Sequence, residues 1–543
     1  MLGGVGWALL AALAGAGFAL AFHPVRHAYL ETSATAAALA IPVWGLVNVI
    51  ALPLLGGEPP LWMLEGMRAE LPALIGWVIF GVVFGVLAQA LSDLARWRLG
   101  AEPVTVASRP AVRTRIVILG GGFAGVSTAE HLEHVFGADR TVSLTLISET
   151  NALLFTPMLA EVAGSSLEPT HISSPLRTSL RRTNVIRGRV EDVDFERRRV
   201  YLAAEAHPTT GEVTIPAREE PFDHLVLALG SVSNYLGLTN VQACAFDFKT
   251  LLDAIRIRNH VIEVFERADR EPNPADRQAL TTIVVAGGGF AGVELAGALN
   301  DFTRGMLVYY PHIQPEELRI VLVHSRDRIL PELSESLASH ALERMAARGV
   351  TFKLNARVAD ARPGVVVLTP PDEIRAETLI WTAGVTPNPL VAKLPLERDR
   401  RGAVVVDANL AVPNRSGVWA LGDCAAVTDA RTGQPCPPTA QFAIREASRL
   451  ARNIHASVHG RPLRRFHFDA LGTLCVVGHH TACAEIKGLR FSGLFAWLLW
   501  RAIYLEKLPG LERKVRVVAD WLIELFFPRD IVQTLELTEA TER

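Results

Sequence analysis

Residues 283–299 read IVVAGGGFAGVELAGAL, and residues 116–132 carry a close copy of this pattern, IVILGGGFAGVSTAEHL. The seven residues GGGFAGV occur at 120–126 and again at 287–293. In each copy an apolar run rich in β-branched residues precedes the glycines, and a helical pattern of apolar residues follows them. Each copy therefore predicts a buried strand, a glycine-rich turn and a helix.

The glycines of both copies fit the GxGxxG pattern of dinucleotide-binding folds. The first glycine permits the tight turn, the second lets the backbone approach a pyrophosphate, and the third lets helix and strand pack closely. The positive N-terminal end of the helix then faces the phosphates. These glycines are Gly120, Gly122 and Gly125 in the first copy and Gly287, Gly289 and Gly292 in the second. Two such turns in one chain predict two bound dinucleotides.

The composition narrows the class of protein. The chain has 543 residues, a net charge of −2 and 50% hydrophobic residues. A protein that binds nucleic acid would carry an excess of basic residues, so we expect no nucleic-acid partner. None of the five cysteines forms a CxxC pair, so we predict neither a metal site nor a redox-active dithiol of that kind.

The N-terminal region contains three uncharged apolar runs, at residues 3–22, 36–55 and 71–92. Each has about the length that a helix needs to cross a bilayer. No Lys or Arg precedes the first run, which disfavours a cleaved signal peptide. No ionisable residue interrupts the runs, so an anchor is favoured over a transporter. We predict a membrane anchor over residues 1–98, with its third helix reaching about residue 94, and a linker over 99–113.

The arginines near these runs indicate the orientation of the anchor. Arg96, Arg98, Arg109, Arg113 and Arg115 follow the third run, whereas the loop before it holds a single arginine among several glutamates. The positive-inside rule therefore predicts that residues 96 onward lie on the cytoplasmic side of a cell (inner) membrane.

Several longer motifs resemble one family over most of the remaining chain. From about residue 114 to residue 530 the chain resembles the type II NADH dehydrogenases, the single-chain NAD(P)H:quinone oxidoreductases of the two-dinucleotide-binding flavoproteins. The motifs are LISETNALLFTPMLAEVA (146–163), HLVLALGS (224–231), FKTLLDAIRIRNHVIEVFE (248–266), LIWTAGVTPNPL (379–390), VWALGDCAAV (418–427) and PPTAQFAIREASRLARNI (437–454).

The resemblance implies an α/β fold with two Rossmann-like domains, in which the NAD(P)H unit is inserted into the FAD unit. The expected segments are 114–280 and 386–465 for FAD, 281–385 for NAD(P)H, and 466–543 at the membrane interface. It further implies that Gly230, Gly422 and Asp423 bind FAD and that Ala383 and Gly384 lie on the nicotinamide side. Glu294 is implied to lie beside the nicotinamide–flavin contact, as a catalytic residue. The alternative for Glu294 is a carboxylate in the first turn of a helix, favoured by the helix dipole.

The sequence departs from the dinucleotide pattern where an acidic residue usually ends the second strand and binds the ribose hydroxyls. In the first unit Ser148 takes this position and Glu149 follows it; in the second unit His324 takes it. Without the carboxylate a 2′-phosphate is not repelled, and His324 with Arg326 could pair with it. The donor is therefore NADH, NADPH or both. The alternative is that Arg326 and Arg328 are solvated loop charges.

A second departure lies in the motif that the family uses for quinone. Ala440 and Gln441 match the family pattern, but Arg445 replaces a glutamine and Glu446 follows it. The resemblance implies that Gln441 meets the quinone headgroup, where an amide can donate to or accept from either redox form. Arg445 could instead pair with Glu446 or another acid.

The positions of the cysteines argue against electron transfer through a redox-active disulfide. Disulfide reductases of this superfamily need a cysteine pair after the first unit's second strand, and residues 150–175 contain none. Cys424 is then expected to be a small packed residue. Cys475 and Cys483 lie in a predicted hairpin at 471–486 and could face each other, with packing favoured over a disulfide or a metal.

The C-terminal region contains two apolar stretches with Trp and Tyr beside basic residues, at 489–508 and 519–528. This pattern is typical of helices that lie in the membrane interface. The resemblance implies that they frame the access of a lipid quinone to the flavin. Ordinary core helices are the alternative.

Together these features predict a FAD-dependent, non-proton-pumping NAD(P)H:quinone oxidoreductase, anchored to the lipid bilayer and using a membrane quinone. One alternative is a membrane-tethered reductase of a soluble partner such as a ferredoxin. Another is a redox sensor with incidental turnover. The sequence leaves open which quinone is used and whether the protein is a homodimer.

Overall fold

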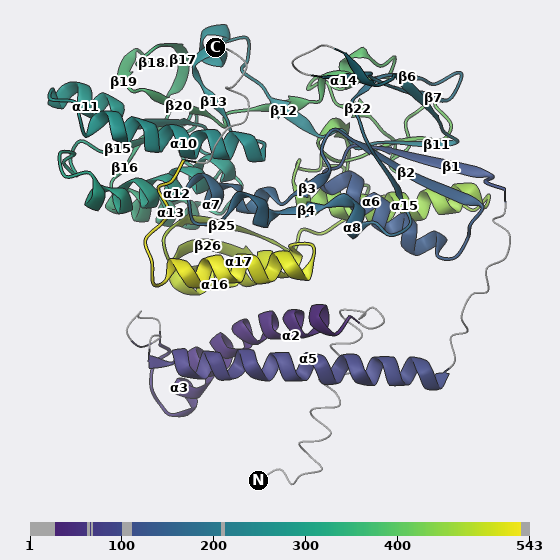
Figure 1. Cartoon of the computed structure of the whole chain (residues 1–543), viewed down its shortest axis with the longest axis horizontal. Coiled ribbons are helices and arrows are strands. Elements are labelled where there is room, and N and C mark those ends of the chain that lie inside the picture. Colours follow the sequence, from purple (N-terminus) through teal and green to yellow (C-terminus); the bar gives the residue numbers. More distant parts are fainter. Residues whose placement is uncertain (1–27, 62–65, 67–68, 100–110, 208–211, 534–543) are drawn as a thin grey trace.

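The computed structural model describes residues 28–61, 66, 69–99, 111–207 and 212–533 (Figure 1). Two α/β cores lie side by side, a layer with the C-terminal helices lies against them, and the N-terminal helices lie beyond that layer. The predicted first membrane run, residues 3–22, lies outside the described residues.

The first core is a five-stranded parallel sheet in the order β23-β11-β1-β2-β5. Helix α6 (Phe123–Phe136) follows the first glycine turn and packs against α15 (Ala440–Val458). Strands β11 and β23 are neighbours although almost 200 residues separate them, so another unit is inserted between them. The strands are β1 (Thr114–Leu119), β2 (Val142–Ser148), β5 (Asn184–Arg187), β11 (His224–Leu227) and β23 (Val418–Ala420).

The inserted unit is a second parallel sheet, in the order β13-β20-β14-β15-β16. Its strands are β13 (Phe246–Asp247), β14 (Thr282–Ala286), β15 (Arg319–Val323), β16 (Val350–Lys353) and β20 (Thr378–Trp381). Its helices are α10 (Leu251–Ala268), α12 (Phe290–Met306) and α13 (Glu335–Ala347). Residues 246–268, which the sequence assigns to the first unit, contribute β13 and α10 to this one.

Two antiparallel strands join the cores, β12 (Ser231–Ser233) and β21 (Val385–Pro387). Each core also carries a small antiparallel sheet. These sheets consist of β6 (Val190–Asp194), β7 (Arg199–Leu202) and β10 (Arg218–Pro221), and of β17 (Arg357–Arg362), β18 (Val365–Thr369) and β19 (Asp372–Arg375). The remaining short elements include β3 (Ala152–Leu154), β4 (Ser173–Pro175), α7 (Leu159–Ala163), α8 (Leu176–Ser179), α9 (Thr239–Cys244), α11 (Pro274–Leu280), α14 (Pro389–Lys393), β22 (Val404–Val405) and β24 (Ala425–Ala426).

The C-terminal unit is an antiparallel sheet of β25 (Gly472–Gly478), β26 (Thr481–Ile486) and β27 (Leu489–Ser492), followed by α16 (Gly493–Lys507) and α17 (Leu511–Glu524). Strand β25 packs on α12 of the inserted unit, and α16 packs on β26. Cys475 and Cys483 stand opposite each other in this hairpin, and both are buried free thiols.

Two of the three predicted membrane runs are helices long and apolar enough to span a bilayer, over Tyr29–Leu55 and Leu71–Leu94. The first consists of α2 (Tyr29–Trp44), a π-helical stretch η1 (Gly45–Ala51) and α3 (Leu52–Leu55). The second belongs to α5 (Leu71–Leu99). These findings rest on length and composition alone, and the number of spans stays a prediction.

Small residues let α2 and α5 pack closely. A Cβ atom on Gly81 would stand 2.7 Å from the carbonyl oxygen of Ala36, and one on Gly85 would collide with the Cα atom of Ser33. This is the close backbone approach that small residues allow at helix–helix contacts in membranes. The hydroxyl of Thr32 also donates to Gln89 Oε1 at 2.6 Å across the same contact.

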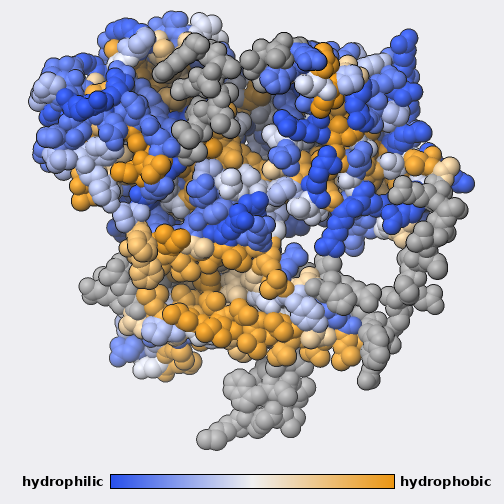
Figure 2. Space-filling view, viewed as in Figure 1, coloured by the Kyte–Doolittle hydropathy of each residue, from blue (hydrophilic) through white to orange (hydrophobic). Residues whose placement is uncertain are grey.

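Helix α2 covers part of the surface that the sequence assigns to lipid. Trp44 is buried and packs with Leu494 and Leu498 of α16, while a Cβ on Gly45 would meet the ring of Phe495 at 3.7 Å. The surface of α16, α17 and the N-terminal helices forms one mostly apolar region in Figure 2. The C-terminal helices therefore contact the chain's own N-terminal helix.

Candidate functional site

The first glycine turn has the geometry that dinucleotide binding requires. Gly120 has φ +117°, and a Cβ there would collide with the carbonyl group of Ala228. A Cβ on Gly125 would collide with the carbonyl oxygen of Gly120, so helix and strand touch at this point. Among the described residues no atom lies within 4 Å of a Cβ built on Gly122. The turn is thus closed on the protein side and open where a pyrophosphate would approach.

The second glycine turn repeats this geometry. Gly287 has φ +120°, and its Cβ would stand 2.6 Å from Thr382 Oγ1. A Cβ on Gly292 would collide with the carbonyl oxygen of Gly287, while Gly289 again has no described atom within 4 Å of such a Cβ. Both predicted glycine triplets therefore occupy equivalent places in two separate sheets.

The residue at the end of the second strand is a serine in the first unit and a histidine in the inserted unit. Buried Ser148 ends β2 and faces Gly121, and exposed Glu149 follows it. His324 follows β15 and faces Gly288, whose N–H donates to His324 Nδ1 at 3.1 Å. Burial lowers the pKa of His324, and exposed Arg326 lowers this pKa further. The imidazole is therefore neutral near pH 7 and keeps its remaining proton on Nε2.

The orientation of His324 creates an unpaired donor. Its Nε2 atom is buried and has no hydrogen-bond partner among the described residues. A buried N–H without an acceptor costs free energy, about 1–3 kcal/mol. This position therefore holds a hydrogen-bond donor, whereas the carboxylate of the usual pattern would be an acceptor.

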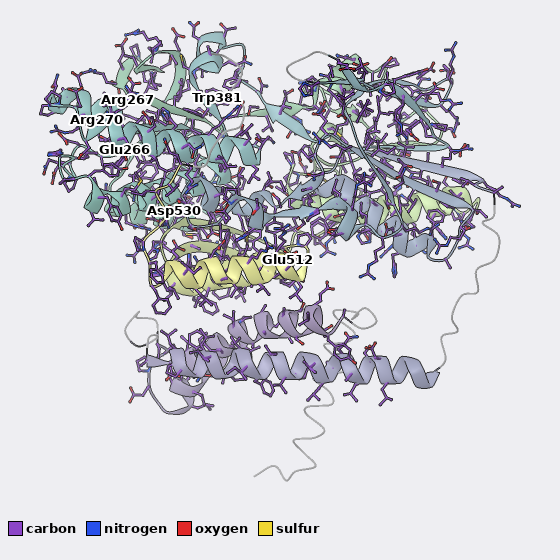
Figure 3. All side chains as sticks on the ribbon, viewed as in Figure 1. Glu266, Arg267, Arg270, Trp381, Glu512 and Asp530 are labelled. Atoms are coloured by element: carbon purple, nitrogen blue, oxygen red, sulfur yellow. The ribbon has the colours of Figure 1, made fainter. Side chains whose placement is uncertain are left out.

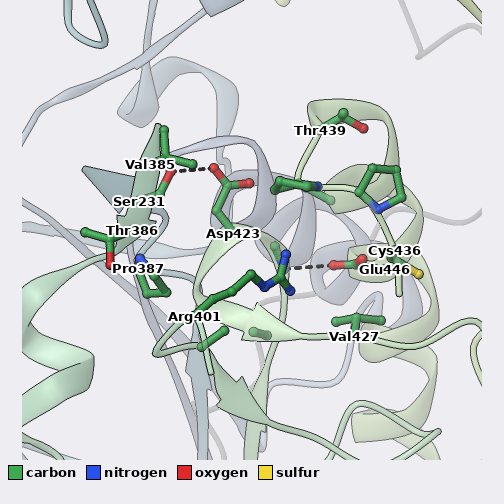
Figure 4. Close-up of a pocket in the computed structure, with 16 residues that line it drawn as sticks. Ser231, Val385, Thr386, Pro387, Arg401, Asp423, Val427, Cys436, Thr439 and Glu446 are labelled. Carbon is green, nitrogen blue, oxygen red and sulfur yellow. Dashed lines mark hydrogen bonds between the residues drawn. The ribbon is translucent and has the colours of Figure 1, made fainter. Parts of the chain in front are cut away.

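Asp423 lies where the two cores meet (Figure 4). It belongs to the short turn η5 (Gly422–Cys424), and its Oδ2 accepts a hydrogen bond of 2.6 Å from the hydroxyl of Ser231 on β12. The Ser231 hydroxyl also accepts from the ammonium group of Lys249 at 2.8 Å. Burial lowers the pKa of Lys249, and Asp423 opposes this effect. Lys249 lies in the motif at residues 248–266, but the sequence pattern alone assigns it no role.

A cavity of about 50 Å³ lies beside Asp423, between β12, β21, η5 and the start of α15 (Figure 4). Its polar lining includes Ser231, Arg401, Asp423, Thr439 and Glu446. The two strands that join the cores, β12 and β21, form one side of the cavity. Gly230 and Gly384 lie at the ends of these strands: Gly230 accepts from the N–H of Asn388, and Gly384 accepts from the N–H of Asn234. Ala383 stands beside Gly384 in the same connection.

The three polar residues of the predicted quinone motif point to different partners. Buried Glu446 accepts a hydrogen bond of 2.7 Å from the N–H of Gly422, and burial raises its pKa to about 7. Exposed Arg445 places its guanidinium 5.4 Å from the ring centre of Phe468, so the two neighbours do not pair with each other. Gln441 donates to the carbonyl of Gly472 at 3.2 Å and accepts from the N–H of Leu471 at 3.1 Å. Gln441, next to Ala440 at the start of α15, therefore ties this helix to β25.

Glu294 lies in α12 beyond the first turn of the helix, so the helix dipole does not account for it. Its carboxylate accepts from the N–H of Val476 on β25 at 3.3 Å. Burial raises its pKa to about 8, and the nearby carboxyl of Glu161 adds to the increase. Glu294 is therefore mostly protonated at neutral pH, as a proton donor must be.

The cysteines form no redox centre among the described residues. All five are free thiols. The Cys424 thiol donates to the backbone oxygens of Leu227 and Leu421, both at 3.4 Å, and burial raises its pKa to about 12. A thiol with that pKa is a packed group rather than a nucleophile.

Comparison with known proteins agrees with this geometry. The family model described as pyridine nucleotide-disulphide oxidoreductase matches residues 114–447, and the chain belongs to this family. The model of the NDH2 C-terminal domain matches residues 471–530, which places the chain among the type II NADH dehydrogenases. Residues 1–113 lie outside both matched segments.

Individual relatives cover most of the chain. Type II NADH:quinone oxidoreductase Ndh of Mycobacterium tuberculosis is 30% identical over 437 residues, which is 78% of this chain and 90% of the relative. Demethylphylloquinone reductase NdbB of a Synechocystis species is 30% identical over 416 residues, 76% of this chain and 96% of the relative. The solved NDH2 of Plasmodium falciparum with NADH shares the fold, with a TM-score of 0.70, 18% identity and coverage of 77% and 100%.

Proposed function

We propose that this chain is a FAD-dependent NAD(P)H:quinone oxidoreductase that does not pump protons. The observation that carries the proposal is the pair of equivalent glycine turns, closed against their own sheets and open at Gly122 and Gly289. The quinone in the names of two relatives supports the acceptor. The net reaction is NAD(P)H + H⁺ + quinone → NAD(P)⁺ + quinol.

The residues of the first core fit FAD. Gly122 leaves space for the pyrophosphate, and Asp423 is held in place by Ser231 and Lys249 at the junction of the cores. When bound, FAD supplies the two-electron chemistry between nucleotide and quinone. The chain contributes a fixed arrangement of the two dinucleotides, which removes the entropic cost of bringing them together.

We assign the second core to the nucleotide donor, with NADPH accepted as well as NADH. The ribose end of this unit carries the unpaired donor of His324 and the nearby guanidinium of Arg326. Neither group repels a 2′-phosphate, whereas the usual carboxylate would.

We assign quinone binding to the region framed by α15, β25 and α16. Gln441 and Glu294 both accept hydrogen bonds from the backbone at or next to β25. We assign contact with the quinone headgroup to Gln441 and proton donation to Glu294. The apolar layer of α16, α17 and α2 gives a lipid quinone a route that a soluble acceptor would not need. The catalytic part lies on the cytoplasmic side of the membrane, as the arginines after the third run predict.

The test is anaerobic and follows the visible absorbance of the flavin in the detergent-purified protein. NADH and NADPH are mixed with the oxidised protein separately, and a short-chain quinone is then added. The proposal expects rapid bleaching by at least one nucleotide and rapid return of the absorbance with quinone. Bleaching that quinone does not reverse would refute the quinone assignment and favour a soluble acceptor or a sensor.

A further inference from the structure

A buried cluster of acids and arginines lies next to Glu294, between α7, α12, α16 and α17. It surrounds a cavity of about 40 Å³. The Trp500 indole also lines this cavity and lowers the pKa of the nearby Glu294 carboxyl group, which opposes the effect of burial. A polar cavity of this size has room for water. The titratable and charged groups near Glu294 are Glu161, Asp301, Cys475, His479, Arg501, Tyr504, Glu524 and Arg529.

The groups of this cluster are linked to one another. Arg501 lies between the rings of Trp497 and Trp521 and pairs with Glu524 at 3.3 Å and with Glu161 at 3.9 Å. Trp521 donates to Glu161 at 3.1 Å. Burial raises the pKa of Glu161, so this carboxyl takes up a proton more readily than an exposed one.

A second, larger cavity of about 580 Å³ lies at the C-terminal ends of α12 and α17 and is open to solvent. Its lining includes Arg348, which pairs with Asp301, and Arg304. The two cavities share four lining residues, namely Asp301, His479, Glu524 and Arg529. Their polar atoms therefore form a common wall between solvent and the small cavity beside Glu294.

The segment that follows α17 holds this wall in place. Arg529 pairs with Glu524 at 2.8 Å and donates to the carbonyl of Gly164 at 2.9 Å, while Asp530 lies 3.6 Å from a guanidinium nitrogen of Arg258. Figure 3 marks the course of this region, with Glu512 near the start of α17 and Asp530 past its end.

We propose that these shared residues and the small cavity conduct the proton that quinone reduction consumes, from the open cavity to the carboxyl group of Glu294. This rests on the proposed function. Reduction of a quinone to its quinol takes two electrons and two protons; the hydride of NAD(P)H accounts for both electrons and one proton. One further proton per turnover must therefore come from solvent. His479 and Glu524 pass it inward, Glu161 and cavity water carry it on, and Glu294 delivers it.

The experiment compares Glu524→Gln with Glu317→Gln. Glu317 is a matched control, because it is a similarly buried carboxylate paired with Arg277 at 2.7 Å in the inserted unit. Stopped-flow absorbance measures bleaching by nucleotide and its reversal by quinone in each variant. We expect bleaching to change by less than about twofold in both, and reversal to slow by about tenfold or more in Glu524→Gln alone. Formate or azide, which carry protons, should restore the rate.

Each outcome is decisive. If the wild-type protein is not reoxidised by quinone, the proposed function fails; if it is and Glu524→Gln matches it, only the proton route fails. A slow variant that neither formate nor azide restores would mean that Glu524 is structural and would overturn the route. His479→Gln replaces Glu524→Gln if the latter does not retain flavin.

A second readout needs no turnover. The infrared carboxyl band that Glu294→Gln removes is followed in the oxidised protein after transfer to deuterated water. The route predicts slower deuteration of this band in Glu524→Gln than in Glu317→Gln. Equal rates in the two variants would overturn it.

Discussion

His324 is the residue whose chemistry differs most from the expected pattern of its fold. Its Nδ1 accepts from the backbone of the glycine turn, and its Nε2 is a buried atom without a hydrogen-bond partner among the described residues. A carboxylate at the same place would accept from ribose hydroxyls and repel a 2′-phosphate. The preference for NADH or NADPH should therefore depend on the His324 side chain.

We predict that His324→Glu shifts the ratio of kcat/KM values for NADH over NADPH upward by about tenfold or more. The measurement is steady-state kinetics with both nucleotides and one quinone. His340→Glu, the same change on α13, controls for added charge. An unchanged ratio in His324→Glu would place the discrimination elsewhere.

Glu446 gives a pH-dependent prediction. Burial raises its pKa from 4.5 to about 7 in the folded protein, so the folded state holds this proton more tightly than the unfolded state. As pH rises from 4.5 to about 7 the unfolded chain ionises first, and the carboxyl then makes folding less favourable. Below this window the carboxyl contributes no such penalty.

Glu446→Gln should therefore raise the apparent Tm at pH 8 relative to wild type, and raise it less at pH 5. The amide oxygen can still accept from Gly422, so the hydrogen bond survives. Thermal unfolding at the two pH values checks this. The same shift at both would show that ionisation of Glu446 does not affect stability.

At the scale of elements, the contact between α2 and α5 depends on two glycines of α5. A side chain on Gly85 would collide with the backbone of α2, whereas no described atom lies within 4 Å of a Cβ on Gly76 of the same helix. Overpacking a close contact costs about 1–3 kcal/mol. We expect Gly85→Leu to lower the apparent Tm in detergent and Gly76→Leu to leave it unchanged. Equal Tm values for both variants would mean that the two helices do not pack this way.

The elements also show what the sequence could predict. The two strand–turn–helix units were predictable because glycine spacing and apolar runs are local features. Lys249 and the Glu161–Arg501–Glu524 cluster were not, because their partners come from distant segments that only the fold brings together. The contact of α2 with α16 was missed for the same reason, since an apolar surface does not reveal whether lipid or another helix covers it.

At the scale of the whole molecule, the predicted dinucleotide-binding residues and the predicted quinone-binding residues differ in their surroundings. The two glycine triplets lie in the turns of two separate sheets, and Asp423 lies beside β12, one of the strands that join the cores. Arg445 and Glu446 contact different partners, since Arg445 lies over the Phe468 ring and Glu446 accepts from the backbone of Gly422. Adjacent residues of a helix project in different directions, so a match to a sequence motif does not by itself show that their side chains meet.

At the scale of the whole molecule, we propose that electrons pass from NAD(P)H to a quinone at a membrane without charge movement across it. The most direct measurement uses the full chain in sealed lipid vesicles that contain a quinone and a voltage-sensitive dye. The account predicts one quinol formed per NAD(P)H consumed, with no dye response. NAD(P)H consumption without quinol would contradict the acceptor, and a dye response abolished by an ionophore would contradict the non-pumping mechanism.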